Sequence, residues 1–301
     1  REMNGKVRHS LRLTAMLYLL DYGAGNIQSL ANSLTKLGYT YEWVREPSDI
    51  SKADKLLFPG VGSFASAMDA LHAKGYVEPL RAYIQSGKPL MGICVGMQVL
   101  FEGSDESPGV QGLGIVPARV GRFATQDAFG RKAVPHMGWS LANVVEWDGC
   151  ADQRHELAKS YGMHDANPSH YYFVHSYRVA WDANVAEWAL TTTQYGNEIF
   201  VSSIQHANVF ATQFHPEKSG QAGLDLLAAW LQLEHVEPTT RVGRPVSSTE
   251  HMPTRRIVAC LDVRSNDAGD LVVTKGESYD VRERGEQDAG ASHVRNMGKP
   301  V

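Results

Sequence analysis

The cysteine at position 94 lies in a pattern that can supply a nucleophile. Gly92-Ile93-Cys94-Val95-Gly96 follows an apolar run and precedes a helical pattern. A glycine-x-nucleophile-x-glycine sequence makes a sharp strand-to-helix turn, in which a Cβ on either glycine would obstruct the backbone. A thiol at a helix N-terminus is favoured in its thiolate form by the helix dipole and free N–H groups. The alternative, a buried structural cysteine between packing glycines, stays open on this motif alone.

A histidine and a glutamate two residues apart could complete a catalytic triad. His215-Pro216-Glu217 comes directly after the apolar run 209–214. A cysteine nucleophile needs a base, and the base needs an acceptor that orients it. We therefore interpret His215 as the base and Glu217 as the carboxylate that holds its ring. A lone histidine is more often structural, so this interpretation depends on its pairing with Cys94.

A third glycine-rich motif, Pro59-Gly60-Val61-Gly62, also follows a predicted strand. Glycines there let backbone N–H groups point into the crevice at the carboxyl ends of the strands, where open α/β folds bind ligands. Two such donors would make an oxyanion hole for a tetrahedral intermediate. The alternative is an ordinary turn between a strand and a helix.

All three motifs follow short apolar runs that alternate with helical patterns. The runs at 17–20, 55–58 and 90–93 predict strands, and the spacing of apolar residues predicts helices over 27–37, 65–71, 76–85 and from Gly96 to Phe101. This alternation predicts an α/β fold with a parallel, doubly wound sheet. Such a sheet would bring the three motifs to one edge.

The pattern changes after about residue 119. Runs rich in β-branched and aromatic residues predict a more antiparallel region, with strands over 171–177, 188–195, 199–205 and 209–214 and a closing helix over 221–233. Residues 234–255 lack periodicity and contain three prolines, which is typical of a linker. Two further strands are predicted over 256–263 and 271–274.

Composition excludes several classes of function. The chain of 301 residues carries 29 Lys and Arg against 33 Asp and Glu, a net charge of −4, so we expect no nucleic-acid partner. No apolar run approaches the ~20 residues that span a bilayer, so we expect no membrane partner. Three cysteines without a C-x-x-C spacing (Cys94, Cys150 and Cys260) favour a reducing compartment, which we take to be the cytoplasm.

Metal and cofactor sites are not expected either. None of the twelve histidines shows an H-E-x-x-H spacing, so we predict no metal. A G-x-G follows the first strand at Gly23 and Gly25, but Gln28 stands where a dinucleotide fingerprint requires glycine. We therefore predict no cofactor.

In combination, the motifs resemble the class I, triad-type glutamine amidotransferases, in which a thiolate attacks the side-chain amide of glutamine. Four of them narrow the resemblance to the glutaminase unit of the imidazole glycerol phosphate synthase family of histidine biosynthesis: 19–26 (LLDYGAGN), 135–139 (PHMGW), 172–177 (YFVHSY) and 212–220 (TQFHPEKSG). Residues 256–263 (RIVACLDV) and 272–276 (VVTKG) resemble the start of the cyclase unit, a (β/α)8 barrel. The resemblance therefore implies a fused amidotransferase and cyclase.

The resemblance implies a flavodoxin-like mixed sheet and assigns roles to matching residues. Cys94 would be the nucleophile, His215 the base and Glu217 its orienting partner. The oxyanion hole would comprise Val61, Gly62 and Val95, and the glutamine would be held by Gln98, Ser176 and Tyr177. Toward the cyclase would lie Trp139, Tyr172, Lys218 and Arg256, and the cyclase site itself would include Asp262 and Lys275. Ser140 stands where the family usually carries asparagine.

The implied organisation is an N-terminal extension (1–15), an amidotransferase domain (16–235), a linker (236–254) and the start of a barrel (255–301). A complete barrel needs ~250 residues, so we interpret the chain as a fragment of a bifunctional enzyme. The extension is interpreted as disordered, with an organellar presequence as the alternative. The implied partners are glutamine and a cyclase barrel in cis.

Two other functions stay open at this point. One is another Cys-His-Glu hydrolase or amidotransferase, such as a γ-glutamyl hydrolase, against which the cyclase-like tail speaks. The other is a scaffold that keeps the fold without catalysis, against which the intact Cys94, His215 and Glu217 speak.

Overall fold

The structure is a computed structural model that describes residues 15–23, 27–128, 130–147, 156, 158–163, 169–233, 243–244, 262–265 and 271–274. The chain divides into two compact units, Arg1–Pro253 and Thr254–Val301, and each is described by itself. The candidate triad lies in the first unit.

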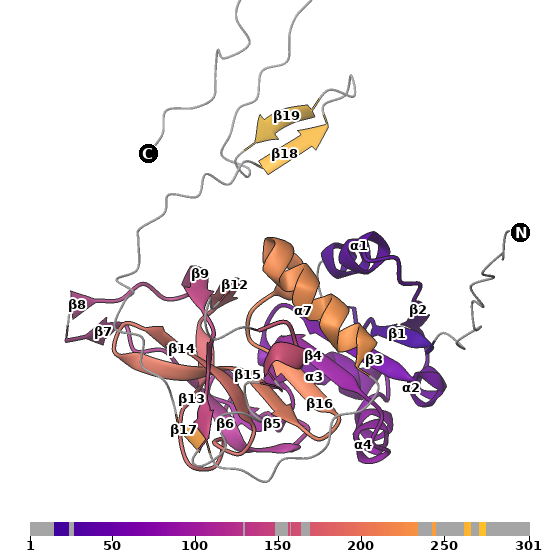
Figure 1. Ribbon diagram of the computed structural model, residues 1–301, viewed down its shortest axis with the longest axis horizontal. Coiled ribbons are helices and arrows are strands. Elements are labelled where there is room, and N and C mark those ends of the chain that lie inside the picture. The colour runs from indigo at the N-terminus through magenta and orange to yellow at the C-terminus, as the bar shows by residue number, and fades with distance from the viewer. Residues whose placement is uncertain are drawn as a thin grey trace, which may run out of the picture. The chain divides into compact units, whose positions relative to one another are not determined.

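One half of the first unit is a parallel sheet with the order β2 (Glu42–Val44), β1 (Leu17–Leu20), β3 (Lys55–Gly60), β4 (Leu90–Cys94) and β16 (Val209–Thr212). All four residues of β1, β16 and the Lys55–Phe58 run are buried, as expected for a parallel sheet covered on both faces. The predicted doubly wound α/β core is therefore confirmed. Figure 1 shows α1 and α7 on one face of these strands and α4 on the other.

The helices of this half are α1 (Gln28–Lys36), α2 (Pro47–Lys52), α3 (Phe64–Ala73), α4 (Val77–Gln85), α5 (Val95–Gln98), the 3₁₀ helix η1 (Pro216–Lys218) and α7 (Gly220–Gln232). Helix α7 ends at the buried side chain of Lys55, whose Nζ donates to the carbonyls of Trp230 at 3.2 Å and Leu231 at 2.7 Å. A cation suits this position because the C-terminal carbonyls of a helix carry partial negative charge.

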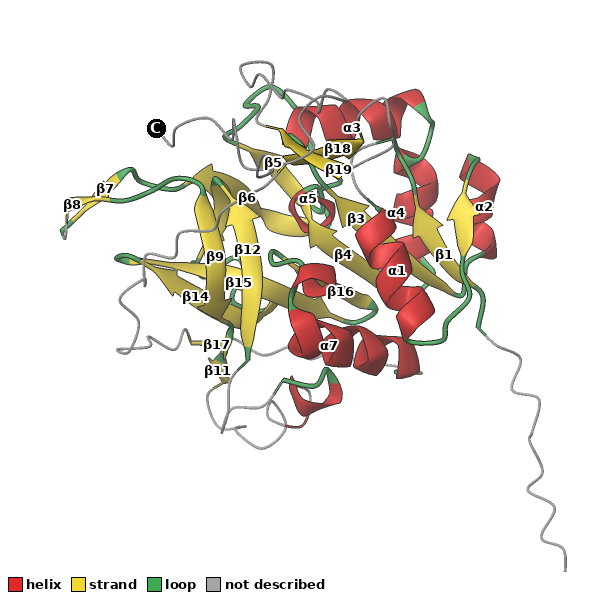
Figure 2. Cartoon of the chain, turned by 90° about the horizontal axis from the view of Figure 1, so that it is seen from above, coloured by secondary structure: helices red, strands yellow, loops and turns green. Residues whose placement is uncertain are grey.

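The predicted antiparallel region is also confirmed. The sheet continues from β16 through β15 (Glu198–His206), β13 (Tyr177–Ala180), β6 (Val116–Arg122) and β5 (Phe101–Ser104), with β14 (Ala189–Tyr195) and β10 (Asn143–Val144) beside β15. Strands β9 (His136–Leu141) and β12 (His170–His175) form a separate antiparallel pair, visible in Figure 2. Two short pairs are β7 (Gln126–Asp127) with β8 (Gly130–Arg131), and β11 (Glu146–Trp147) with β17 (Gly243–Arg244), which lies within the expected linker.

The helix expected from Gly96 to Phe101 is wrong in length. Helix α5 ends at Gln98, and β5 begins at Phe101. The backbone carbonyls of Val99 and Leu100 accept from the N–H groups of Leu113 and Ile115 at 2.7 and 2.8 Å, so they are not available to a longer helix. A distant segment thus ends the helix after one turn.

The second unit contains two described strands, β18 (Asp262–Ser265) and β19 (Leu271–Thr274), which pair antiparallel. Residues 271–274 form the strand that the sequence predicts. Asp262 is the first residue of β18, while Arg256 and Lys275 lie outside the described residues, as do residues 1–14. The start of a (β/α)8 barrel stays a prediction.

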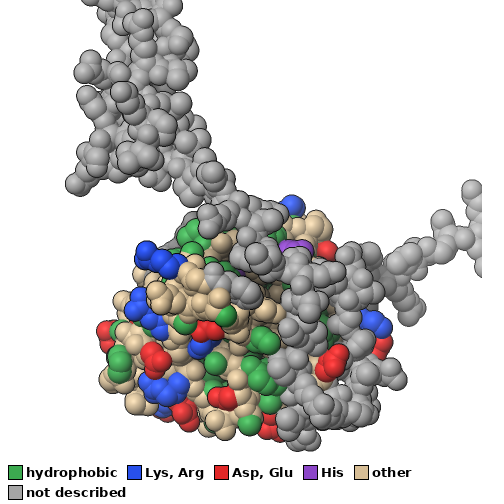
Figure 3. Space-filling view, turned by 90° about the vertical axis from the view of Figure 1, so that its left-hand side faces the viewer, with side chains coloured by type: hydrophobic (Ala, Val, Ile, Leu, Met, Phe, Trp, Pro, Cys, Tyr) green, Lys and Arg blue, Asp and Glu red, His purple; other side chains and the backbone are tan. Residues whose placement is uncertain are grey.

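Charges of both signs are interspersed on the face of the molecule drawn in Figure 3, with isolated apolar side chains between them. No helix among the described residues combines the length and the apolar character needed to cross a membrane.

Candidate active site

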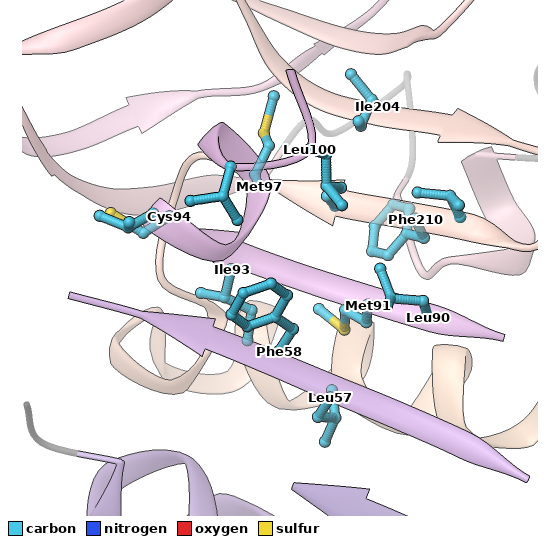
Figure 4. Close-up of a cluster of buried hydrophobic side chains, with 14 of the residues drawn as sticks. Leu57, Phe58, Leu90, Met91, Ile93, Cys94, Met97, Leu100, Ile204 and Phe210 are labelled. Carbon is cyan, nitrogen blue, oxygen red and sulfur yellow. The ribbon is translucent and has the colours of Figure 1, made fainter. Parts of the chain in front are cut away.

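The backbone at Cys94 makes the sharp turn that the glycine motif predicts. Cys94 ends β4 with φ +55° and ψ −111°, a conformation that a residue with a side chain rarely adopts. A Cβ on Gly96 would lie 2.0 Å from the carbonyl oxygen of Phe58, and one on Gly92 2.7 Å from that of Gly96. In Figure 4, Cys94 lies at the end of the strand, beyond the buried cluster that includes Phe58 and Ile93. Both glycines are therefore required by close backbone approach.

The strand next to β4 delivers the histidine. His215 follows β16, and its N–H donates to the carbonyl of Tyr172 at 2.9 Å, which fixes the chain as it leaves the sheet. His215 Nδ1 lies 2.8 Å from Glu217 Oε1, and the two side chains are only 3% and 8% exposed. The Ser219 hydroxyl donates to the His215 carbonyl and accepts from the Tyr172 N–H. The structure thus pairs His215 with Glu217 as the sequence predicts.

The electrostatics of His215 indicate a cation. Burial lowers the pKa of His215, because it disfavours the charged ring. The negative charge of Cys94 and hydrogen bonds to Cys94 and Glu217 act in the opposite direction and prevail, raising the pKa of His215 to about 10. The arrangement is therefore suited to a thiolate–imidazolium pair backed by a carboxylate, as a cysteine nucleophile requires.

The glycine motif after β3 lies beside the nucleophile. Gly60 is in register with Cys94, and a Cβ on Gly60 would lie 2.2 Å from the N atom of Gly96. Gly62 has φ +93°, which favours glycine. Val61 borders a hollow of about 260 Å³, open to solvent, that is also lined by His215 and Glu217. Val95 begins α5, immediately after the nucleophile.

The three residues predicted to hold the substrate differ in their contacts. Gln98 is 4% exposed, and its Nε2 donates to the carbonyl of Tyr177 at 3.1 Å and to Gln213 Oε1 at 2.9 Å. Ser176 accepts a hydrogen bond from the Phe123 N–H through its carbonyl at 3.1 Å. The sequence analysis missed Gln213, whose Nε2 lies 3.7 Å from Cys94 Sγ. Its place two residues before His215 is the signal that could have identified it.

Three of the four residues predicted to face the cyclase lie near one another. Trp139 of β9 is in register with Tyr172 of β12, and their ring centroids are 6.2 Å apart. Trp139 is 41% exposed and its neighbour on the same strand, Met137, is 58% exposed. Lys218 is exposed in η1, directly after Glu217.

The described residues contain no group of three or more His, Cys, Asp or Glu side chains that could hold a metal ion. Cys94 is a free thiol, while Cys150 and Cys260 lie outside the described residues.

The model of one protein family, glutamine amidotransferase class-I, matches residues 18–231. The chain belongs to this family. The match spans β1 to α7 and contains the three candidate triad residues.

Curated relatives narrow the comparison. The chain is 41% identical over 218 residues to imidazole glycerol phosphate synthase subunit HisH of Methanothermobacter thermautotrophicus, which covers 72% of this chain and 98% of that protein. It is 48% identical over 288 residues to imidazole glycerol phosphate synthase hisHF of Emericella nidulans, which covers 95% of this chain but 50% of that protein. The chain thus spans about half the length of the fused relatives it matches.

A solved structure from Thermoplasma acidophilum, of a protein named for GMP synthase, is 16% identical. The match covers 72% of this chain and 92% of that one, with a TM-score of 0.50. This likeness supports the fold alone. The HisH and hisHF relatives disfavour the γ-glutamyl hydrolase and scaffold alternatives.

Proposed function

We propose that this chain is the glutaminase part of a fused imidazole glycerol phosphate synthase of histidine biosynthesis, with glutamine as its substrate. The observation that carries the proposal is the triad: Cys94 on a strained turn, next to a His215 whose raised pKa of about 10 reflects its contacts with Cys94 and Glu217. The relatives HisH and hisHF carry this synthase name over both portions of the chain.

The first half-reaction follows from the charge state of the pair. The Cys94 thiolate adds to the carboxamide carbon of glutamine, and the carbonyl electrons move to oxygen. Backbone N–H groups at Val61 or Gly62 and at Val95 would bind this oxyanion. His215 then gives its proton to the amide nitrogen, the carbon–nitrogen bond breaks, and ammonia leaves. A γ-glutamyl thioester remains on Cys94.

The second half-reaction uses the same histidine as a base, since it is neutral after the first. Water adds to the thioester carbonyl while His215 accepts its proton, with Glu217 holding the ring through the 2.8 Å contact at Nδ1. The carbon–sulfur bond then breaks to release glutamate, and the thiolate and imidazolium are restored. Gln98, Ser176 and Tyr177 are proposed to hold the amino-acid end of glutamine.

The ammonia is proposed to pass to a cyclase barrel in cis. There it reacts with a phosphoribulosyl-formimino aminoimidazole carboxamide ribonucleotide, giving imidazole glycerol phosphate and aminoimidazole carboxamide ribotide. Trp139, Tyr172 and Lys218 form the proposed face toward that barrel, beside the triad, with Arg256 at its entrance. Asp262 and Lys275 belong to the cyclase site.

We further propose the domain bounds 16–235 for the amidotransferase, 236–254 for the linker and 255–301 for the start of the barrel. The chain acts in a reducing compartment, the cytoplasm or an organelle, which suits the free thiol of Cys94.

Glutamate release from glutamine tests the proposal. We expect a low rate from this chain alone and stimulation by a complete cyclase barrel with a stable acceptor analogue, abolished by Cys94→Ala. A fast rate that ignores the barrel and analogue would indicate another glutaminase or hydrolase. No release from folded protein in any mixture would contradict a glutaminase.

A further inference from the structure

A buried glutamine outside the triad contacts the sulfur of Cys94. Gln213 is fully buried, and its backbone N–H donates to the Ser202 carbonyl at 2.9 Å, so its main chain is fixed beside β15. Its Nε2 donates to Cys94 Sγ at 3.7 Å, within the range for a sulfur acceptor. The sulfur therefore has a neutral donor in addition to His215.

The orientation of this amide is set by a second glutamine. Gln98 Nε2 donates to Gln213 Oε1 at 2.9 Å, so the oxygen of Gln213 faces Gln98 and its nitrogen faces the sulfur. The reverse orientation would place a carbonyl oxygen against the sulfur and leave two N–H donors opposed. Gln98 is itself anchored, because its Nε2 also donates to the Tyr177 carbonyl at 3.1 Å.

The Tyr177 carbonyl is the meeting point of a second chain of hydrogen bonds. His175 Nδ1 donates to it at 2.8 Å, so Nε2 of the neutral His175 ring is an acceptor. His136 Nδ1 then donates to His175 Nε2 at 3.3 Å, and His136 Nε2 accepts from the Ser140 hydroxyl at 2.9 Å. Burial lowers the pKa of His136 to about 2 and of His175 to about 3, so both rings stay neutral and the direction of the chain holds.

We propose that Gln213 is a further catalytic residue, whose amide N–H holds the Cys94 sulfur in place and stabilises its negative charge, and that Gln98 is a positioning residue that fixes this amide. The inference rests on the proposed function in that Cys94 is the nucleophile. An amide suits the role because it does not ionise near neutral pH, so it stabilises the thiolate without competing with His215 for the proton. A hydrogen bond to a charged group is also stronger than one between neutral groups.

Alkylation of Cys94 by iodoacetamide in the full chain tests the contact directly, with the modified peptide quantified by mass spectrometry. Loss of one hydrogen bond to a charged group predicts that Gln213→Met slows alkylation about tenfold to a hundredfold. Gln213→Glu should slow it at least as much, because a carboxylate replaces the donor. Gln98→Met should slow it less, because the Gln213 amide remains but is free to turn.

Gln205 provides the matched control. It is 2% exposed, and its Nε2 donates to the Ala207 carbonyl at 3.1 Å, so Gln205→Met also removes a buried glutamine from the same sheet. We expect this variant to alkylate at the wild-type rate. Equal slowing in Gln205→Met and Gln213→Met would assign the effect to general loosening and overturn the proposal.

Two further results would overturn it. One is an unchanged alkylation rate in Gln213→Met, with a raised KM for glutamine, which would place Gln213 in substrate binding instead. The other, decisive where the Gln213 variants do not fold by near-UV circular dichroism, is an unchanged rate in Gln98→Met. Alkylation uses no glutamine, so a chain that lacks glutaminase activity but shows the predicted rates would refute the proposed function and leave the contact standing.

Discussion

The glycine after the nucleophile should be the most sensitive position of the turn. In Gly96→Ala the new Cβ would lie 2.0 Å from the Phe58 carbonyl oxygen, well over 1 Å closer than an ordinary contact of 3.4–4 Å. Phe58 cannot withdraw easily, since it is in register with Gly92 inside the sheet. Helix α5 must therefore move, and Cys94 moves with it.

The magnitude follows from the size of that displacement. Overpacking of a core costs about 1–3 kcal/mol, which in a domain of 150–250 residues lowers the thermal midpoint by about 2–12 °C. A misplacement of about 1 Å at a reacting group costs about a hundredfold in rate. We therefore expect Gly96→Ala to unfold earlier and to lose about a hundredfold in glutamate release or in Cys94 alkylation.

Gly109→Ala is the control, because a Cβ there meets nothing within 4 Å. Calorimetry and the alkylation assay on both variants make the comparison. The reasoning is refuted if Gly96→Ala alkylates within twofold of Gly109→Ala and melts at the same temperature. It is also refuted if both substitutions are equally harmful.

Three other predictions concern charged and titrating groups. In an NMR titration, the pKa of His215 should fall from about 10 in Cys94→Ala, because the charge and hydrogen bond of the thiol are lost; an unchanged titration would contradict the thiolate–imidazolium pair. His136 and His175 have pKa values of about 2 and 3 when folded, below the ordinary 6.5, so the stability they contribute is present above pH 6.5 and is lost as pH falls toward 3. Between pH 6.5 and 5 each should cost about 2 kcal/mol in urea unfolding, a loss that His136→Phe should roughly halve. Lys55→Met should lower the free energy of unfolding by about 1–3 kcal/mol, because it leaves the last carbonyls of α7 buried without their donor; an unchanged urea midpoint would contradict this.

Local patterns were sufficient to predict most of the elements that position the triad. The strand 17–20 has the bounds that its four apolar residues predict, and the glycines around Cys94 are required by the contacts that the motif implies. These features depend on neighbours in the sequence. The family resemblance added the order of the motifs, and the match over residues 18–231 agrees with it.

Contacts between distant segments account for what the sequence did not predict. Helix α5 is short because Leu113 and Ile115 bind carbonyls that a longer helix would need. The role of Gln213 depends on Gln98 and Cys94, which lie 115 and 119 residues away. Nothing in the spacing of single residues reports such partners.

Covalent labelling tests the central claim most directly. A diazoketone analogue of glutamine, which alkylates a nucleophile that binds the substrate, is incubated with the folded chain, and the modified residue is located by peptide mass spectrometry. The account predicts a single adduct on Cys94, slowed by competing glutamine and absent in Cys94→Ala. An adduct on another residue, or none on folded protein, would contradict Cys94 as the nucleophile of a glutaminase.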